Sequence, residues 1–254
     1  GTEFGLFFSP DGGDNWVQLK AGLPTIAVRD IEIQRRENDL VLGTFGRGFY
    51  VLDDYTPLRN LKKESFDQEA VIFPVKDAWM FIPSKPLGLR DKGHLGSSYY
   101  AAANPPVGAV FTYYLKNDIK TLKAKRQEAE KTKFDKKEVV YYPEIEDLRK
   151  EDEQPEPYLL FTITDAAGKV VRHLKAPAKK GLQRIVWDMR YATSAPALGR
   201  MKLTPDQLFG EEDKGYLAMP GQYSVSLSKF EDGVLSQLAG PVVFNTKSLN
   251  NATL

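Results

Sequence analysis

Short runs of apolar residues, separated by glycine, proline, aspartate and asparagine, dominate the pattern of this chain. In the clearest run, Gln222–Lys229, apolar Tyr223, Val225 and Leu227 alternate with polar neighbours. Successive side chains of a strand point to opposite faces, so a period of two predicts a strand with one buried face. Further strands are expected at 29–34, 39–44, 70–74, 78–83, 108–116, 159–164, 169–174, 181–188, 234–238 and 241–244. The pattern therefore predicts a mainly β protein.

One region departs from this pattern. Residues 118–137 are highly charged, and their few apolar positions form only a thin helical stripe. We expect a solvated helix with Asp118 as its N-cap. It belongs to an insertion over about 118–157, and the acidic stretch 144–156 returns the chain to the sheet. The lysine excess lacks the interleaved aromatic residues of a nucleic-acid platform, so no nucleic-acid partner is expected.

The segment SPDGGDNW, residues 9–16, lies between two short apolar runs and predicts a hairpin turn built by its own side chains. A carboxylate such as Asp11 can accept hydrogen bonds from backbone N–H groups a few residues on. Gly12 and Gly13 can supply left-handed backbone angles. Trp16 then begins the second strand and can cover the turn. This segment is thus expected to be a structural device.

The same local pattern occurs twice. GTEFGLFF at 1–8 is similar to GTFGRGFYV at 43–51, and Asp11 has a counterpart in Asp54. The offset of 42 to 43 residues (43 − 1 and 54 − 11) fits a four-stranded propeller blade. The repeat therefore predicts the end of one blade and most of the next.

Four residues, Ser9, Asp11, Gly13 and Trp16, match the pattern Ser-x-Asp-x-Gly-x-x-Trp. This resembles the Asp-box, or BNR repeat, of sialidase-type and sortilin-type β-propellers, in which the box is a folding device. GTFGRGFYVLDD at 43–54 resembles the closing segment of sortilin-like, glycosyl-hydrolase-related bacterial proteins. TDAAGKVVRHL, GLQRIVWDMRY and MPGQYSVSLSKFEDG resemble the Ig-like module that follows the propeller in that group.

The resemblance implies a domain order. Residues 1–57 are the last one to two blades of an Asp-box β-propeller, and 58–106 are a connecting segment with short strands that dock against it. Residues 107–246 form an immunoglobulin-like β-sandwich with the helical insertion, and 247–254 are a tail. The resemblance further implies the carboxy-terminal part of a longer exported protein, which is secreted, periplasmic or on the cell surface. The remaining blades, in the same protein or a separate fragment, are then its partners.

Composition removes several function classes. The chain of 254 residues has 35 lysines and arginines against 34 acids, so no global field favours an anionic partner. It has no cysteine, and its two histidines, His94 and His173, lie far apart in sequence. We therefore expect neither a metal site nor a cofactor. No apolar run is long enough to span a bilayer.

Two functional hypotheses remain open. The first is a non-catalytic structural or binding region, with a glycan or peptide as ligand. The second is a supporting part of a sialidase-type hydrolase whose active site lies mainly in upstream blades, so whether the parent protein is an enzyme stays open. Such sialidases use a tyrosine nucleophile and an arginine cluster. The resemblance accordingly implies the channel candidates Arg29, Arg47 and Tyr50. If the channel instead held the pair of carboxyl groups that other glycosidases use, Asp53 and Asp54 would be its candidates.

Overall fold

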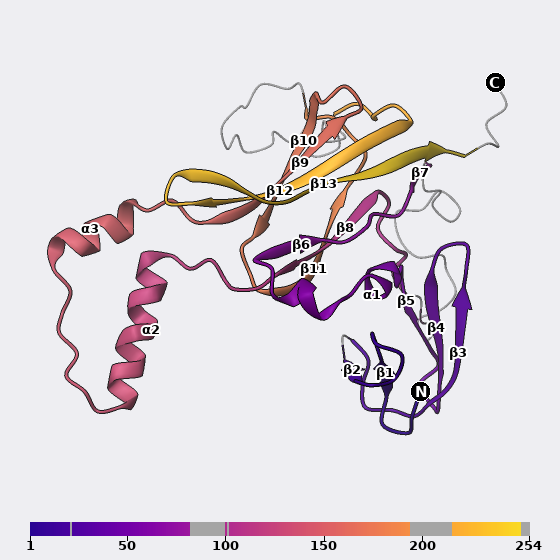
Figure 1. The fold of residues 1–254 in the computed structure, drawn as a ribbon, viewed down its shortest axis with the longest axis horizontal. Helices are drawn as coiled ribbons and strands as arrows, with labels where there is room; N and C mark the ends of the chain where they lie inside the picture. Colours follow the sequence, from indigo (N-terminus) through magenta and orange to yellow (C-terminus); the bar gives the residue numbers. More distant parts are fainter. Residues whose placement is uncertain (21, 82–99, 101, 194–214, 250–254) are drawn as a thin grey trace. The chain divides into compact units, whose positions relative to one another are not determined.

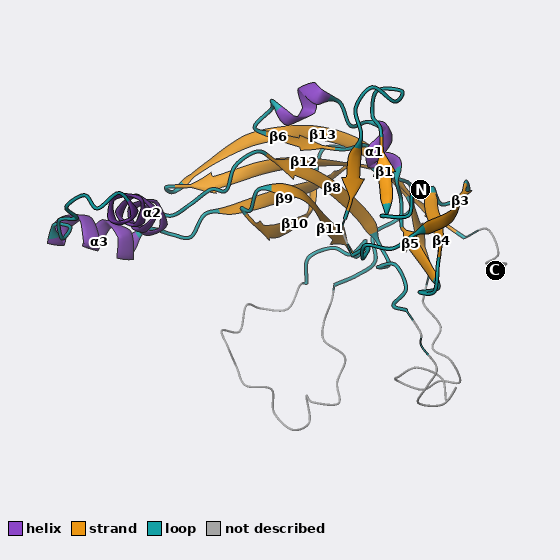
Figure 2. Cartoon of the chain, turned by 90° about the horizontal axis from the view of Figure 1, so that it is seen from below, coloured by secondary structure: helices purple, strands orange, loops and turns teal. Residues whose placement is uncertain are grey.

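The structure, a computed structural model, describes residues 1–20, 22–81, 100, 102–193 and 215–249. It divides into two compact units (Figure 1). The amino-terminal unit contains Gly1–Asp67 with Ile82–Val107, and the carboxy-terminal unit contains Gln68–Phe81 with Gly108–Leu254. Strands predominate over helices in the described residues, so the mainly β class is confirmed (Figure 2).

Two small antiparallel sheets form the amino-terminal unit. The first is a hairpin of β1 (Leu6–Phe8) and β2 (Val17–Leu19). The second has the order β3-β4-β5, from Val28–Gln34, Asp39–Thr44 and Phe49–Leu52. A short helix α1 (Thr56–Arg59) and a 3-10 turn (Lys63–Phe66) follow. The strands expected at 29–34 and 39–44 are present as β3 and β4, both in the three-stranded sheet.

Successive side chains along β3, β4 and β5 point to opposite faces of the sheet, so one face is packed and the other is open to solvent. Leu42 pairs with Ile31 and Tyr50, and it is buried with Leu6 and Val28. Half-buried side chains complete this cluster: Leu19, Leu23, Leu40 and Tyr50. The opposite face carries Phe49, which is 80% exposed, and Val51, which is 54% exposed.

The internal repeat is visible in the hydrogen bonds of the two Gly-Thr segments. Thr2 donates both its N–H and its hydroxyl to the carbonyl of Gly5, at 2.9 and 3.2 Å. Thr44 does the same to the carbonyl of Gly48, at 3.1 and 2.6 Å. Each loop therefore closes through a threonine that caps the glycine ahead of an apolar strand.

Two sheets make up the carboxy-terminal unit, and together they form a curled half-barrel. The larger has the order β10-β9-β12-β13-β7, from Val170–Pro177, Tyr158–Asp165, Gly221–Glu231, Val234–Ser248 and Ala78–Met80. The smaller has the order β11-β8-β6, from Gly181–Trp187, Ala109–Leu115 and Ala70–Ile72. The runs expected at 234–238 and 241–244 are one continuous strand, β13.

Aromatic side chains from both sheets meet in one core. Phe111 of β8 lies 6.4 Å from Phe161 of β9 and 5.3 Å from Phe244 of β13, between ring centroids. Trp187 of β11 meets Tyr223 of β12 at 5.1 Å. Trp187 also donates its indole N–H to the carbonyl of Arg190 at 2.9 Å, which satisfies a group that burial would otherwise penalise. Large aromatic side chains bury the most apolar area, so this cluster holds the unit together.

Residues 70–80 contribute two short strands to the carboxy-terminal unit: β6 pairs with β8, and β7 pairs with the end of β13. The β7–β13 pairing is parallel. Ala70, Ile72 and Ala78 are buried in this arrangement, which explains why so short a pair of segments belongs to the carboxy-terminal unit.

The insertion forms an arm of two helices, α2 (Leu122–Asp135) and α3 (Ile145–Glu153), with no buried residue in either. Asp118 is not the N-cap of α2. The cap is Thr121, whose hydroxyl accepts a hydrogen bond from the Ala124 N–H, while Asp118 accepts from the Lys180 N–H at 2.7 Å. Arg126 links the two helices through Glu151, at 2.6 and 2.8 Å. No helix among the described residues is long and apolar enough to cross a membrane.

Candidate functional site

The turn between β1 and β2 closes on its own side chains. One oxygen of Asp11 accepts hydrogen bonds from the Ser9 hydroxyl and the Asn15 backbone N–H, both at 2.9 Å. Its other oxygen accepts from the Asn15 side-chain amide at 2.6 Å. The Ser9 hydroxyl in turn accepts from the Gly13 N–H at 2.7 Å. Both carboxylate oxygens of Asp11 are thus engaged within the turn.

Trp16 and two glycines complete this geometry. The Trp16 indole N–H donates to the Gly13 carbonyl at 2.9 Å, although the side chain is 63% exposed. Gly12 and Gly13 have φ of 76° and 113°, which are angles that side-chain-bearing residues rarely adopt. The sequence prediction of left-handed glycines in this turn is confirmed.

Hydrogen bonding lowers the pKa of Asp11 from 3.8 to about 2. The side-chain amide of Asn15 contributes most, followed by its backbone N–H and then by the Ser9 hydroxyl. Donors that bind the charged form favour it, which is the direction seen here. The folded pKa lies below the unfolded one. The contribution of Asp11 to stability is therefore present above pH 3.8 and is lost as the pH falls through about 2.

Replacing Gly13 tests how far this turn depends on its backbone. A Gly13→Ala variant must hold a Cβ at φ of 113°, and we expect a loss of about 1–3 kcal/mol in the local stability of the turn. Hydrogen exchange of the Asn15 amide, compared between the variant and the unaltered chain, measures this. Gly22→Ala serves as the control, because it places a Cβ at a positive φ of 73° outside the turn. Equal protection in Gly13→Ala and the unaltered chain would contradict the expectation.

The channel candidates lie near the β3-β4-β5 sheet, and the contacts of three of them are local. Exposed Arg29 lies over the ring of Phe45, with its guanidinium carbon 5.4 Å from the centroid. Tyr50 packs against the buried cluster of this unit. Asp54 donates its N–H to Asp39 at 3.0 Å and accepts from the Thr56 N–H at 3.1 Å.

The other two channel candidates lie close by in the chain. Arg47 is exposed between β4 and β5, and Asp53 is half-buried just after β5.

Histidine and metal chemistry receive no support from the described residues. His173 is exposed on β10, and its Nδ1 lies 3.2 Å from the Thr162 hydroxyl. His94 lies outside the described residues. Across the described part of the chain, no cluster of three or more histidine, cysteine, aspartate or glutamate side chains is arranged to hold a metal ion.

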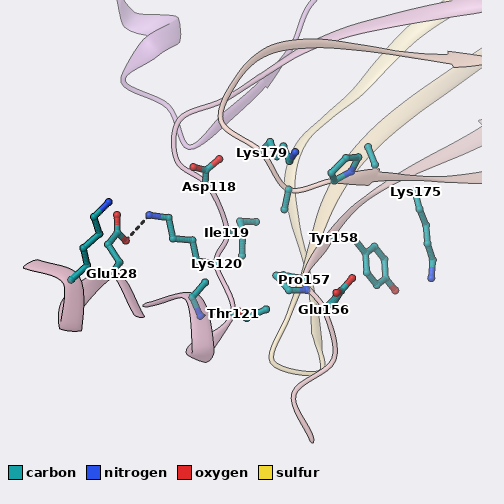
Figure 3. A pocket seen from close by; sticks show the side chains of 15 residues that line it. Asp118, Ile119, Lys120, Thr121, Glu128, Glu156, Pro157, Tyr158, Lys175 and Lys179 are labelled. Carbon is teal, nitrogen blue, oxygen red and sulfur yellow. Dashed lines mark hydrogen bonds and ion pairs between the residues drawn. The ribbon is translucent and has the colours of Figure 1, made fainter. Parts of the chain in front are cut away.

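A hollow in the carboxy-terminal unit was not expected from the sequence. It has a volume of about 1130 Å³ and lies between the start of α2, the first residues of β9 and the end of β10 (Figure 3). Lys120 is paired with Glu128 at 2.6 Å, and Lys175 lies over the ring of Tyr158 at 4.2 Å. Two of the lysines that line the hollow are thus held in local contacts. The hollow is lined by residues as far apart in sequence as Lys120 and Lys175, which only the tertiary fold brings together. No local sequence motif could therefore have predicted this hollow.

Comparisons with known proteins do not assign this chain to a family. No protein-family model, no curated protein and no solved structure matches this chain.

Proposed function

We propose that this chain is a non-catalytic structural and binding region of an exported Asp-box propeller protein. In this proposal the amino-terminal unit is the end of the propeller, and the carboxy-terminal unit is an Ig-like module that serves recognition or domain docking. One observation carries the proposal: both oxygens of Asp11 close the turn that contains them. A carboxylate committed in this way is a poor acid, base or ligand, because any such role would break the turn.

The open face of the β3-β4-β5 sheet supports the part of the proposal in which further blades pack against the amino-terminal unit. Phe49 and Val51 are largely exposed there, and Phe45 is 70% exposed in the turn after β4. Exposed apolar surface of this kind marks interaction sites. Further blades, from the same protein or from a separate fragment, are the partners that the proposal names, and a glycan or peptide is the ligand.

Substituting the apolar side chains of this open face tests whether the face is a docking surface or part of a core. We expect Phe49→Thr with Val51→Thr to change the free energy of unfolding by less than about 0.5 kcal/mol per site, because surface substitutions usually cost little. The same variant should bind less of a dye that recognises apolar surface.

Leu42→Ala is the matched control on the packed face of the same sheet. Leu42 is 3% exposed, so its truncation should cost about 2 kcal/mol or more. Urea unfolding and dye fluorescence measure both variants. A large loss of stability in the double threonine variant would show that these side chains are part of a core, against the proposal.

An assay of hydrolysis separates this function from the sialidase-type alternative. Fluorogenic sialosides and other glycosides are incubated with the chain, and with its Tyr50→Phe and Asp53→Asn variants. The proposal expects no turnover above the buffer rate. Turnover that disappears in either variant would overturn the non-catalytic function.

A further inference from the structure

The connection between α2 and α3 exposes an unusual amount of apolar side chain. We call residues 138–142 the distal segment; Figure 1 shows it leaving the end of α2 that is remote from the strands. Val139, Tyr141 and Tyr142 are 68%, 81% and 85% exposed, and Val140 is 40% exposed. Such large apolar side chains in one run ordinarily occupy a strand.

The backbone of the distal segment lacks the partners that a strand normally has. The Glu138 N–H donates to the Lys133 carbonyl at 2.9 Å and so ends the helix. Beyond it, residues 139–142 form no hydrogen bond with any residue that the structure describes. A β-prone segment with free N–H and C=O groups is a template for pairing with another chain.

Charge distribution around the distal segment is asymmetric. Its amino-terminal flank carries Lys136 and Lys137, and its carboxy-terminal flank carries Glu144 and Glu146. All four side chains are exposed. Antiparallel pairing of two identical segments would bring the basic flank of each against the acidic flank of the other. The segment is thus complementary to itself in charge.

We propose that the distal segments of two copies of this chain pair antiparallel about Val140 and form a two-fold symmetric dimer. In this register Val139 of each copy lies opposite Tyr141 of the other, and Val140 lies opposite itself. Cross-strand pairs between aromatic and β-branched side chains stabilise such ladders. A contact between the same surface of both copies is self-complementary and relates the two copies by a two-fold axis.

A second copy fits the segment better than an anionic membrane does. Insertion at a membrane would carry unpaired backbone groups away from water, which is costly. Pairing satisfies the groups that face the partner strand and leaves the others in water. Because two short segments bury less than a standard interface, we expect a weak dimer with a Kd on the order of 100 µM.

Cross-linking tests the register directly, since the chain contains no cysteine. In Val140→Cys the two new thiols would face each other at the two-fold axis, and mild oxidation should yield a covalent dimer. Val170→Cys is the matched control, because Val170 is 47% exposed on β10 of the same unit. We expect cross-linking at least about tenfold faster in Val140→Cys, as a specific site should exceed random collision. Equal rates in the two variants would overturn the proposal.

Charge reversal gives a second test by sedimentation equilibrium of the intact chain. One variant combines Lys136→Glu with Lys137→Glu, and the other combines Glu144→Lys with Glu146→Lys. Each alone sets like charges against each other and should raise the dimer Kd at least about tenfold. An equimolar mixture restores opposite charges in the heterodimer and should dimerise as well as the unaltered chain. An unaltered chain that stays monomeric well above the expected Kd would refute the dimer.

Vesicles distinguish the membrane alternative. The chain is mixed with vesicles of phosphatidylcholine, with or without phosphatidylglycerol, and sedimented. The proposal expects no binding to either composition. Binding of a monomer to the phosphatidylglycerol vesicles, lost in Val140→Ser, would assign the distal segment to lipid and contradict the dimer.

Discussion

Phe161→Ala is expected to lower the free energy of unfolding of the carboxy-terminal unit by about 3–5 kcal/mol. Phe161 is fully buried, and its ring lies 4.9 Å from that of Tyr113 and 6.4 Å from that of Phe111. Its truncation removes apolar burial and leaves a cavity between the two sheets. Urea unfolding followed by the fluorescence of Trp187, which is buried in the same core, measures the loss.

Tyr216→Ala is the control for this measurement. Tyr216 is 79% exposed in the same unit, so its truncation should change stability by less than about 0.5 kcal/mol. If Phe161→Ala were no more destabilising than Tyr216→Ala, the two sheets would not share the core described above.

Gly108→Ala is expected to lower the free energy of unfolding of the same unit by about 3 kcal/mol or more. Two effects combine at this position. The backbone has φ of 142°, and a Cβ would lie 2.2 Å from the carbonyl oxygen of Trp187. That oxygen belongs to the backbone of β11, which pairs with β8, so the clash can be relieved only by moving a strand. Urea unfolding and the amide signals of β8 report the change.

Gly168→Ala separates these two effects. Gly168 has φ of 78°, but no atom lies within 4 Å of the position of an added Cβ. It should therefore show only the cost of a left-handed backbone, about 1–2 kcal/mol. Equal losses in the two variants would indicate that the close approach of β8 and β11 contributes nothing.

The sequence predicted those turns and strands whose conformation is determined by residues close together in the chain. The Ser9–Trp16 turn depends on a carboxylate and glycines at fixed spacing, and these side chains form the hydrogen bonds that close it. The alternation at 222–229 predicted β12, whose Tyr223, Val225 and Leu227 are buried. In such segments the sequence pattern and the tertiary environment favour the same structure.

The sequence did not predict features that depend on contacts between distant residues, namely the partners of β6 and β7 and the N-cap of α2. The strands β6 and β7 are three residues each, so nothing within them specifies a partner, and their pairing with β8 and β13 follows from burial in a core formed mostly by later residues. Asp118 and Thr121 are both good caps by residue type. The N–H of Lys180, sixty-two positions on, engages Asp118 and leaves the cap to Thr121.

The candidate site residues also divide into those that a local sequence pattern predicts and those that it does not. The pattern Ser9, Asp11, Gly13 and Trp16 identified the turn, whereas the set of channel candidates came from a resemblance and has no local signal of its own. Tyr50 illustrates the difficulty, since a tyrosine on a strand packs into a core or faces a channel according to the register of its sheet. Here the pairing of Tyr50 with Leu42 places it beside the buried cluster.

The ionisation of Asp11 tests most directly whether the Ser9–Trp16 turn is a structural device. The measurement is an NMR titration of its carboxyl carbon, assigned by comparison with Asp11→Asn, without ligand and then with calcium or sialic acid. A self-bonded turn predicts a pKa of about 2 that neither addition changes. A pKa near 3.8 in the free chain, together with a shift on adding calcium or sugar, would contradict the structural role and show instead that Asp11 is free to bind a ligand.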